Sequence, residues 1–225
     1  MTTTARSTSV TQPWGLGDAL IGICAGFTGS IVLGTILGVT GHPSLGVQFI
    51  LNLPLWAAFL AVPIWATRSR GAGPKLDLHL QVRPIDALAL VVGGVVQVVV
   101  GWAYLPFVSN RELEKPAQTL AHSAHGTPAK ILLALMTCLI APALEELFYR
   151  GLILQAVRRR LPDWSAVLAV ALVFAAMHFE ALQLPGLFVF GAVAGTLCVR
   201  TDRLGPAVLA HMGFNAVALW QLHIL

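Results

Sequence analysis

Six polar residues in the second half of the sequence are of types that can hydrolyse a peptide bond. They are Glu145, Glu146, Arg150, His178, His211 and Asn215. Each lies within a long apolar run or at its end. Ionisable side chains inside such runs are energetically costly and rare, and they usually mark a functional site. The cluster therefore predicts acid–base chemistry inside apolar segments.

The spacing of the glutamates and the arginine predicts different roles for the two carboxylates. Glu146 and Arg150 are four residues apart, so on a helix they lie one turn apart and can form an ion pair. Glu145 lies about 100° around the helix and is left without that partner. A site built in this way holds one reactive carboxylate without burying two bare charges.

Two schemes of amide hydrolysis suit these side chains. In one, Glu145 and an imidazole activate a water molecule, while His and Asn side chains stabilise the oxyanion of the tetrahedral intermediate. In the other, Glu145, His178 and His211 bind a divalent metal such as zinc, with one position left for water. The sequence contains neither His-Glu-x-x-His nor Gly-x-Ser-x-Gly, so zincin and serine-hydrolase sites are unsupported.

Membrane helices are the elements predicted to position these residues. The chain is 56% hydrophobic and 11% charged, whereas a soluble domain carries about 25% charged residues. An apolar run of roughly 20 residues crosses the hydrocarbon core. We therefore predict an all-α, polytopic membrane helix bundle of about seven transmembrane helices in the cell membrane. The predicted runs are Ala19–Val39, Leu45–Ala66, Ala87–Leu105, Ile131–Val157, Ala166–His178, Leu184–Val199 and Pro206–Leu225.

The distribution of basic residues predicts the orientation of this bundle. With a cytoplasmic N-terminus, the cytoplasmic loops receive eleven of the fourteen Lys and Arg residues. The prediction is N-in and C-out, and the net charge of +4 then reflects membrane orientation rather than nucleic-acid binding. Counted from the cytoplasmic ends, Glu145, His178, His211 and Asn215 fall within one layer and could line one cavity that opens to the cytoplasm.

Glycines at helical spacing predict close helix packing in two of these runs. In the first run, small residues recur every four positions at Gly22, Gly26, Ser30, Gly34 and Gly38. Gly191 and Gly195 repeat the spacing in the sixth run. Rows of small residues allow neighbouring backbones to approach closely in a membrane.

Three motifs, in their order along the chain, resemble those of the CPBP family of intramembrane endopeptidases, which includes CAAX proteases and bacteriocin-processing (Abi) proteins. The motifs are Glu145-Glu146-x-x-x-Arg150, Phe174-x-x-x-His178 and His211-x-x-x-Asn215. The resemblance covers residues 129–225, a predicted catalytic core of four helices. Residues 1–128 are predicted to supply a cytoplasmic tail and three scaffold helices.

The resemblance implies a role for each motif residue. Glu145 and His178 would activate the attacking water, and His211 and Asn215 would stabilise the oxyanion. Glu146 and Arg150 would organise the site. Members of the family are often described as metalloproteases, but a metal-free glutamate mechanism is the reading favoured here, with a zinc site as the alternative.

The predicted function is hydrolysis of a peptide bond in a hydrophobic or lipid-associated substrate, within the bilayer and without a nucleic-acid partner. The alternative is a non-proteolytic membrane protein of the same fold with an immunity or regulatory role. An ion-coupled carrier is a third reading, because buried carboxylates and histidines also serve proton relays. It ranks last, since the sequence lacks the broken helices in repeated halves that carriers show.

Overall fold

The computed structural model describes residues 14–222, apart from 42, 105, 109–117 and 119–123. The predicted tail, residues 1–13, lies outside the described residues, as do the last three residues of the seventh predicted run. Every regular element in the described part of the chain is helical. The predicted all-α class is therefore confirmed.

The helices follow the predicted apolar runs. The N-terminal half contains α1 (Leu16–Ile36), α2 (Leu45–Arg70), α3 (Pro74–Asp77), η1 (Pro84–Ala87) and α4 (Leu88–Tyr104). A continuous rod follows, made of α6 (Gly126–Leu135), η2 (Met136–Ile140), α7 (Ala141–Glu146), η3 (Leu147–Ile153) and α8 (Leu154–Arg158). The chain ends with α9 (Asp163–Ala176), α10 (Leu184–Thr201) and α11 (Gly205–Gln221).

Five helical segments in the described residues are long and apolar enough to cross a membrane. They are Leu16–Ile36, Leu45–Arg70, Pro84–Tyr104, Gly126–Arg158 and Leu184–Thr201. Helix α9 is apolar but shorter, and α11 covers the last predicted run. Five of the seven predicted spans are thus matched, while the count of seven and the N-in/C-out orientation remain predictions.

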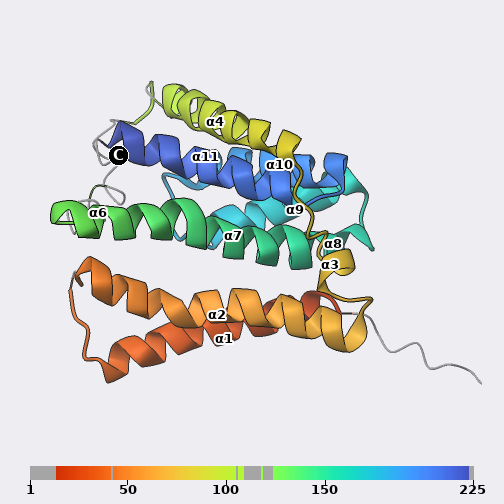
Figure 1. The fold of residues 1–225 in the computed structure, drawn as a ribbon, viewed down its shortest axis with the longest axis horizontal. Coiled ribbons are helices and arrows are strands. Elements are labelled where there is room, and N and C mark those ends of the chain that lie inside the picture. Colours follow the sequence, from red (N-terminus) through yellow and green to blue (C-terminus); the bar gives the residue numbers. More distant parts are fainter. Residues whose placement is uncertain (1–13, 42, 105, 109–117, 119–123, 223–225) are drawn as a thin grey trace, which may run out of the picture.

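Helices α1 and α2 form a hairpin at one side of the molecule (Figure 1). The predicted glycine row explains their close contact, because Gly26 lies against Leu55 of α2 and Gly34 against Leu51. Gly38 is an exception, since it follows the end of α1 and has a φ of +60°. The hairpin meets the rod through Phe59 of α2.

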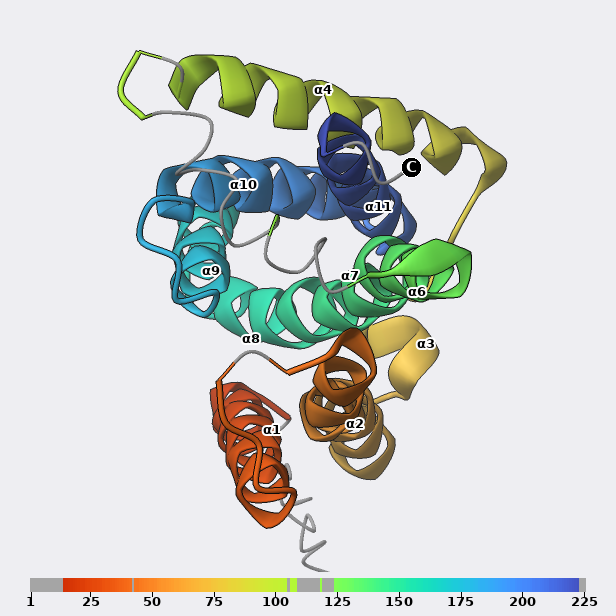
Figure 2. The ribbon, with the colours of Figure 1, turned by 90° about the vertical axis from the view of Figure 1, so that its left-hand side faces the viewer.

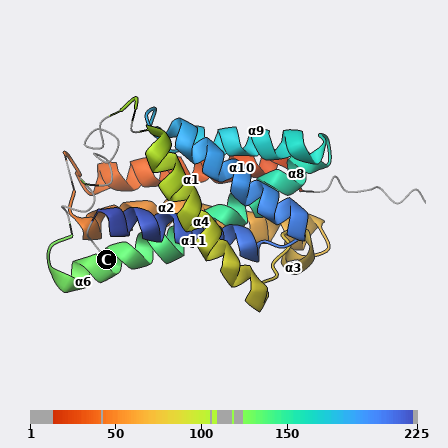
Figure 3. The same ribbon diagram turned by 90° about the horizontal axis from the view of Figure 1, so that it is seen from above.

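The remaining helices pack around the rod. Seen end-on, α9, α10 and α11 complete a ring with the rod, and α4 covers the outer side of α10 and α11 (Figure 2). Helix α4 crosses α11 obliquely (Figure 3). Their backbones touch at Gly93 and Gly213, where an added Cβ would overlap a carbonyl of the other helix. The predicted pair Gly191 and Gly195 packs on α9 in a similar way.

The linker after α2 holds one end of α11. The backbone N–H of Leu204 donates to the carbonyl of His79, and that of Gly205 donates to Gln81. Arg203 forms an ion pair with the buried Asp86, 2.5 Å away. These bonds fix the position of α11 along its axis, and α11 carries two of the predicted site residues.

Candidate active site

Two π-helical turns flank the short helix that carries the glutamate pair. Turn η2 precedes α7 and turn η3 follows it. In a π-helical turn, each backbone N–H bonds the carbonyl five residues back rather than four. Such turns inside α-helices occur frequently at functional sites. Here they set the direction in which the side chains of α7 point.

Glu146 and Arg150 form the predicted ion pair in the centre of the molecule. The Nη1 of Arg150 lies 2.7 Å from Oε1 of Glu146, and both side chains are fully buried. A second guanidinium nitrogen, Nη2, donates to the Gly191 carbonyl at 3.0 Å. Two atoms of the pair, Oε2 of Glu146 and Nε of Arg150, are buried and have no hydrogen-bond partner among the described residues.

His211 on α11 bridges the two glutamates. Its Nδ1 lies 2.8 Å from Oε1 of Glu146, and its Nε2 lies 3.9 Å from Oε2 of Glu145. A carboxylate only accepts, so the Nδ1–H donates to Glu146. In a neutral imidazole this leaves the Nε2 lone pair facing Glu145. Because the Glu145 side chain is 21% exposed and that of Glu146 is fully buried, the two carboxylates have different environments.

Asn215 contacts the first π-helical turn. In η2 the Ala141 N–H bonds the Met136 carbonyl, five residues back. The next carbonyl, that of Thr137, would meet Pro142, which has no N–H. The Asn215 side chain donates to this carbonyl instead, with Nδ2 and O 2.7 Å apart. A side chain from a neighbouring helix thus replaces the missing backbone donor, because a carbonyl inside a membrane must be hydrogen-bonded within the protein.

His178 lies just beyond α9 and is half-buried. Its Nδ1 is 2.7 Å from the Phe174 carbonyl of the same motif. The Phe174 ring lies 4.5 Å below the Arg150 guanidinium, and its centroid is 5.7 Å from that of His211. Among the described residues, no ion pair or hydrogen bond joins His178 to Glu145. The structure thus brings the three motifs together around Phe174 but places His211 nearest to Glu145.

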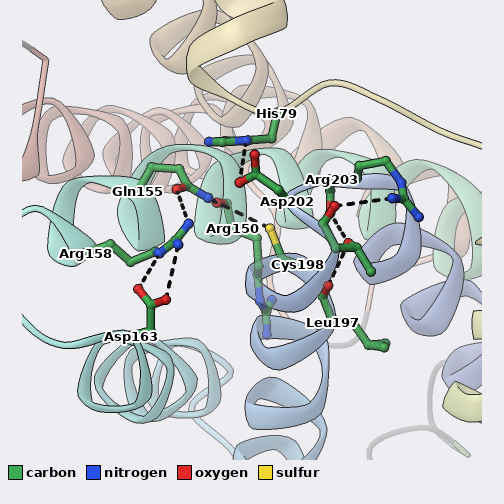
Figure 4. Close-up of polar contacts among 10 residues, drawn as sticks. His79, Arg150, Gln155, Arg158, Asp163, Leu197, Cys198, Asp202 and Arg203 are labelled. Carbon is green, nitrogen blue, oxygen red and sulfur yellow. Dashed lines mark hydrogen bonds and ion pairs between the residues drawn. The ribbon is translucent and has the colours of Figure 1, made fainter.

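Gln155 was missed by the sequence reasoning. Its side chain is 9% exposed, and its Nε2 donates to the Arg150 carbonyl at 3.1 Å. Its Oε1 accepts from Nη1 of Arg158 at 3.0 Å (Figure 4). One polar residue inside a predicted span, five positions after the motif arginine, was the available signal.

The predicted zinc ligands are not gathered into one group. In the part of the chain that the structure describes, no group of three His, Cys, Asp or Glu side chains could hold a metal ion. Of the predicted ligands, Glu145 and His211 lie close together, whereas His178 bonds the Phe174 carbonyl through Nδ1. The arrangement does not support the His2Glu zinc scheme, which stays a prediction.

Comparison with known proteins identifies the segment that contains all three motifs. Residues 127–217 match the family described as Rce1-like, type II CAAX prenyl endopeptidase Rce1-like. The family resemblance is thereby confirmed. The match to this membrane-protease family and the apolar helices together make the chain a multi-pass membrane protein.

A protein from Escherichia coli is similar to about half of this chain. It is described as an uncharacterized 24.3 kDa protein and is 30% identical over 121 residues. The match covers 50% of this chain and 56% of the relative, so it spans little more than half the relative's length. No solved structure matches the chain. The Rce1-like segment begins next to the start of α6 and leaves α1, α2 and α4 outside it.

Proposed function

We propose that the protein is an intramembrane endopeptidase that cleaves a peptide bond in a hydrophobic or lipid-associated substrate. The observation that carries this proposal is the facing pair of Glu145 and His211. Their Oε2 and Nε2 atoms are 3.9 Å apart, which is too long for a direct hydrogen bond and suits a bridging water. The endopeptidase description of the matched family supports the same chemistry.

Glu145 is the proposed general base. Its partly exposed carboxylate accepts a proton from the bridging water as the water oxygen attacks the scissile carbonyl carbon. The proton then passes to the nitrogen of the leaving amine, and the C–N bond breaks. His211 orients the water through Nε2, while its Nδ1–H remains donated to Glu146. The buried Glu146–Arg150 pair holds this imidazole in place.

Asn215 and His178 complete the proposed site. An amide nitrogen carries two hydrogens, so Asn215 can bind the Thr137 carbonyl with one N–H and an oxyanion with the other. The bond from His178 Nδ1 to the Phe174 carbonyl leaves its Nε2 available as a second proton acceptor. This assignment gives His211 the water-orienting role, and it keeps His178 as the partner implied by the family motif.

A comparison of peptides released by cells tests the function. Membrane and secreted peptides are compared between wild type and Glu145→Gln, with the exposed Glu180→Gln as the matched control. We expect a set of peptides that disappears in Glu145→Gln and persists in the control. Identical peptide sets, with both variants inserted at wild-type levels, would instead support the non-proteolytic alternative.

A further inference from the structure

The second π-helical turn leaves one carbonyl without a backbone donor. At the end of η3 the Leu154 N–H bonds the carbonyl of Tyr149, five residues back. When the rod returns to the four-residue pattern in α8, the next N–H pairs with the carbonyl of Gly151. The Arg150 carbonyl is skipped, and in an apolar interior an unpaired carbonyl is costly.

The Gln155 amide fills this gap. Nε2 donates to the Arg150 carbonyl at 3.1 Å and lies 3.9 Å from the Cys198 sulfur, a weak contact. The side chain is itself held at its other end, because Oε1 accepts from Arg158, which is bonded to Asp163 at 2.8 Å. Figure 4 shows this chain of contacts running from Asp163 to the rod.

The position of this carbonyl connects it to the site. Arg150 carries the guanidinium that holds Glu146, and Glu146 holds His211. Without the cap, the rod can satisfy the carbonyl by returning to a regular α-helix. The extra residue of the wider turn then joins the regular helix, and α7 rotates relative to α8 by the angle of one residue, about 100°. Glu146 would then no longer face His211.

We propose that Gln155 is a positioning residue for peptide hydrolysis, acting through the backbone of Arg150 to hold the Glu146–His211 contact. The inference rests on the proposed function for its catalytic consequence. Asn215 plays the corresponding structural part at the first π-helical turn, where its amide bonds the Thr137 carbonyl. The helix that carries both glutamates is thus held between two side-chain amides.

Selective isotope labelling can observe this cap directly. The sequence contains two Arg–Gly pairs, Arg70–Gly71 and Arg150–Gly151. With ¹³C-carbonyl arginine and ¹⁵N-glycine, a carbonyl–amide correlation spectrum of the full-length protein in lipid nanodiscs therefore shows two signals. Arg70 serves as the internal control. A second sample labelled with ¹⁵N in the arginine guanidinium groups only, in which the Arg150 signals are assigned by their loss in Arg150→Lys, reports on the pair of Arg150 with Glu146.

Two variants separate the donor from the acceptor of Gln155. Gln155→Glu keeps an oxygen for Arg158 but removes the N–H donor, and Gln155→Met removes both. We expect the Arg150 carbonyl signal to move in both variants because its hydrogen-bond donor changes, the Arg150 guanidinium signals to shift, and the Arg70 signal to stay. An unmoved Arg150 carbonyl would overturn the proposal. A moved carbonyl with unchanged guanidinium signals would also overturn it, because the cap would then position nothing.

Cleavage kinetics test the catalytic consequence. The probe is an internally quenched peptide that ends in a prenylated CAAX sequence, chosen from the family description. We expect kcat to fall about tenfold or more in both variants with KM unchanged, since small misplacements of catalytic groups carry large rate penalties. Thr67→Val is the control, because it removes a buried side-chain bond to the Pro63 carbonyl in α2, and its kcat should be retained.

The two measurements distinguish failure of the inference from failure of the proposed function. Wild type that leaves the probe intact counts against this substrate class, while the carbonyl and guanidinium signals still decide the role of Gln155. Wild-type kcat in both Gln155 variants would overturn the positioning role even if the carbonyl signal moves.

Discussion

The α1–α2 hairpin and the core of α6–α11 differ in how far protein covers their helices. In the most apolar windows of α1 and α2, 17% of the residues are buried, compared with 33% in the rod and in α10. Three polar side chains illustrate the same division. Asn52 and Thr67 in the hairpin bond carbonyls of their own helix, whereas His211 in the core bonds Glu146 of another helix.

This difference shows where an intramembrane site can be built. A polar side chain that bonds a carbonyl of its own helix needs no hydrogen-bond partner from a neighbouring helix. A charged or amide side chain that serves chemistry must be held by other helices, and this requires the greater burial of the core. The hairpin therefore tolerates lipid on most of its surface, while the core carries the ionisable groups. The first three predictions below each pair a core substitution with one in the hairpin.

The largest effect is expected for Arg150→Met. Removing the guanidinium leaves Glu146 buried without a counter-ion, which costs about 3–5 kcal/mol of unfolding free energy. Arg70→Met breaks the ion pair with Asp18 at the end of the hairpin, where the Arg70 side chain is 33% exposed. Its loss should be clearly smaller. Unfolding in detergent measures both, and equal losses would remove the distinction between the two regions.

The next effect is expected where helices touch through backbone. Gly213→Ala places a Cβ against the Leu90 carbonyl of α4, and overpacking of this kind costs about 1–3 kcal/mol. Gly17 in α1 has open space at the same position, so Gly17→Ala should leave stability unchanged or slightly raised. Thermal unfolding compares the two, and a tolerated Gly213→Ala would show that α4 can separate from α11.

A smaller effect is expected for the side-chain amides. Asn215→Ala leaves the Thr137 carbonyl without its donor, and hydrogen bonds between membrane helices contribute about 0.6–1.7 kcal/mol. Asn52→Ala removes a bond within α2 to the Gln48 carbonyl and should cost less. Unfolding free energies of the two variants give the comparison. A larger loss of unfolding free energy for Asn52→Ala would contradict the expectation that bonds between helices contribute more stability than bonds within one helix.

The smallest loss of stability is expected at Asp163, the exposed end of the hydrogen-bonded chain Asp163–Arg158–Gln155. The hydrogen bond from Arg158 lowers the pKa of Asp163 below its usual value. A lowered carboxyl pKa contributes stability at neutral pH that is lost as the pH falls through that lowered value. Asp163→Asn should therefore lower the melting temperature slightly at pH 7 and make no difference in strong acid. A difference that persists in acid would show that the charge of Asp163 is not its cause.

Features that depend on neighbouring residues were predictable from the sequence. Hydropathy located the helices, because a membrane span must be continuously apolar. The four-residue spacing predicted the pair of Glu146 and Arg150, and the glycine spacing predicted the contacts of Gly26 and Gly191. The roles of the site residues in catalysis remain predictions.

Features that depend on tertiary packing were not predictable. The bond between His211 and Glu146 joins residues 65 positions apart, and no local spacing indicates which histidine approaches which glutamate. The π-helical turns were hidden because this run is apolar on most of its faces, so the phase shift of a wider turn leaves no periodic signal to detect. The effect of Pro142 was equally hidden, because only the structure shows that Asn215 bonds the Thr137 carbonyl that the proline cannot reach.

The division of labour between the two glutamates is the central claim, and one paired measurement tests it. Purified Glu145→Gln and Glu146→Gln are assayed side by side for melting temperature and for hydrolysis of the prenylated CAAX probe or of a peptide found in the cellular comparison. We predict that Glu145→Gln abolishes hydrolysis and melts as wild type does, whereas Glu146→Gln melts at a clearly lower temperature because Arg150 loses its partner. Hydrolysis at the wild-type rate by a folded Glu145→Gln variant would contradict the account.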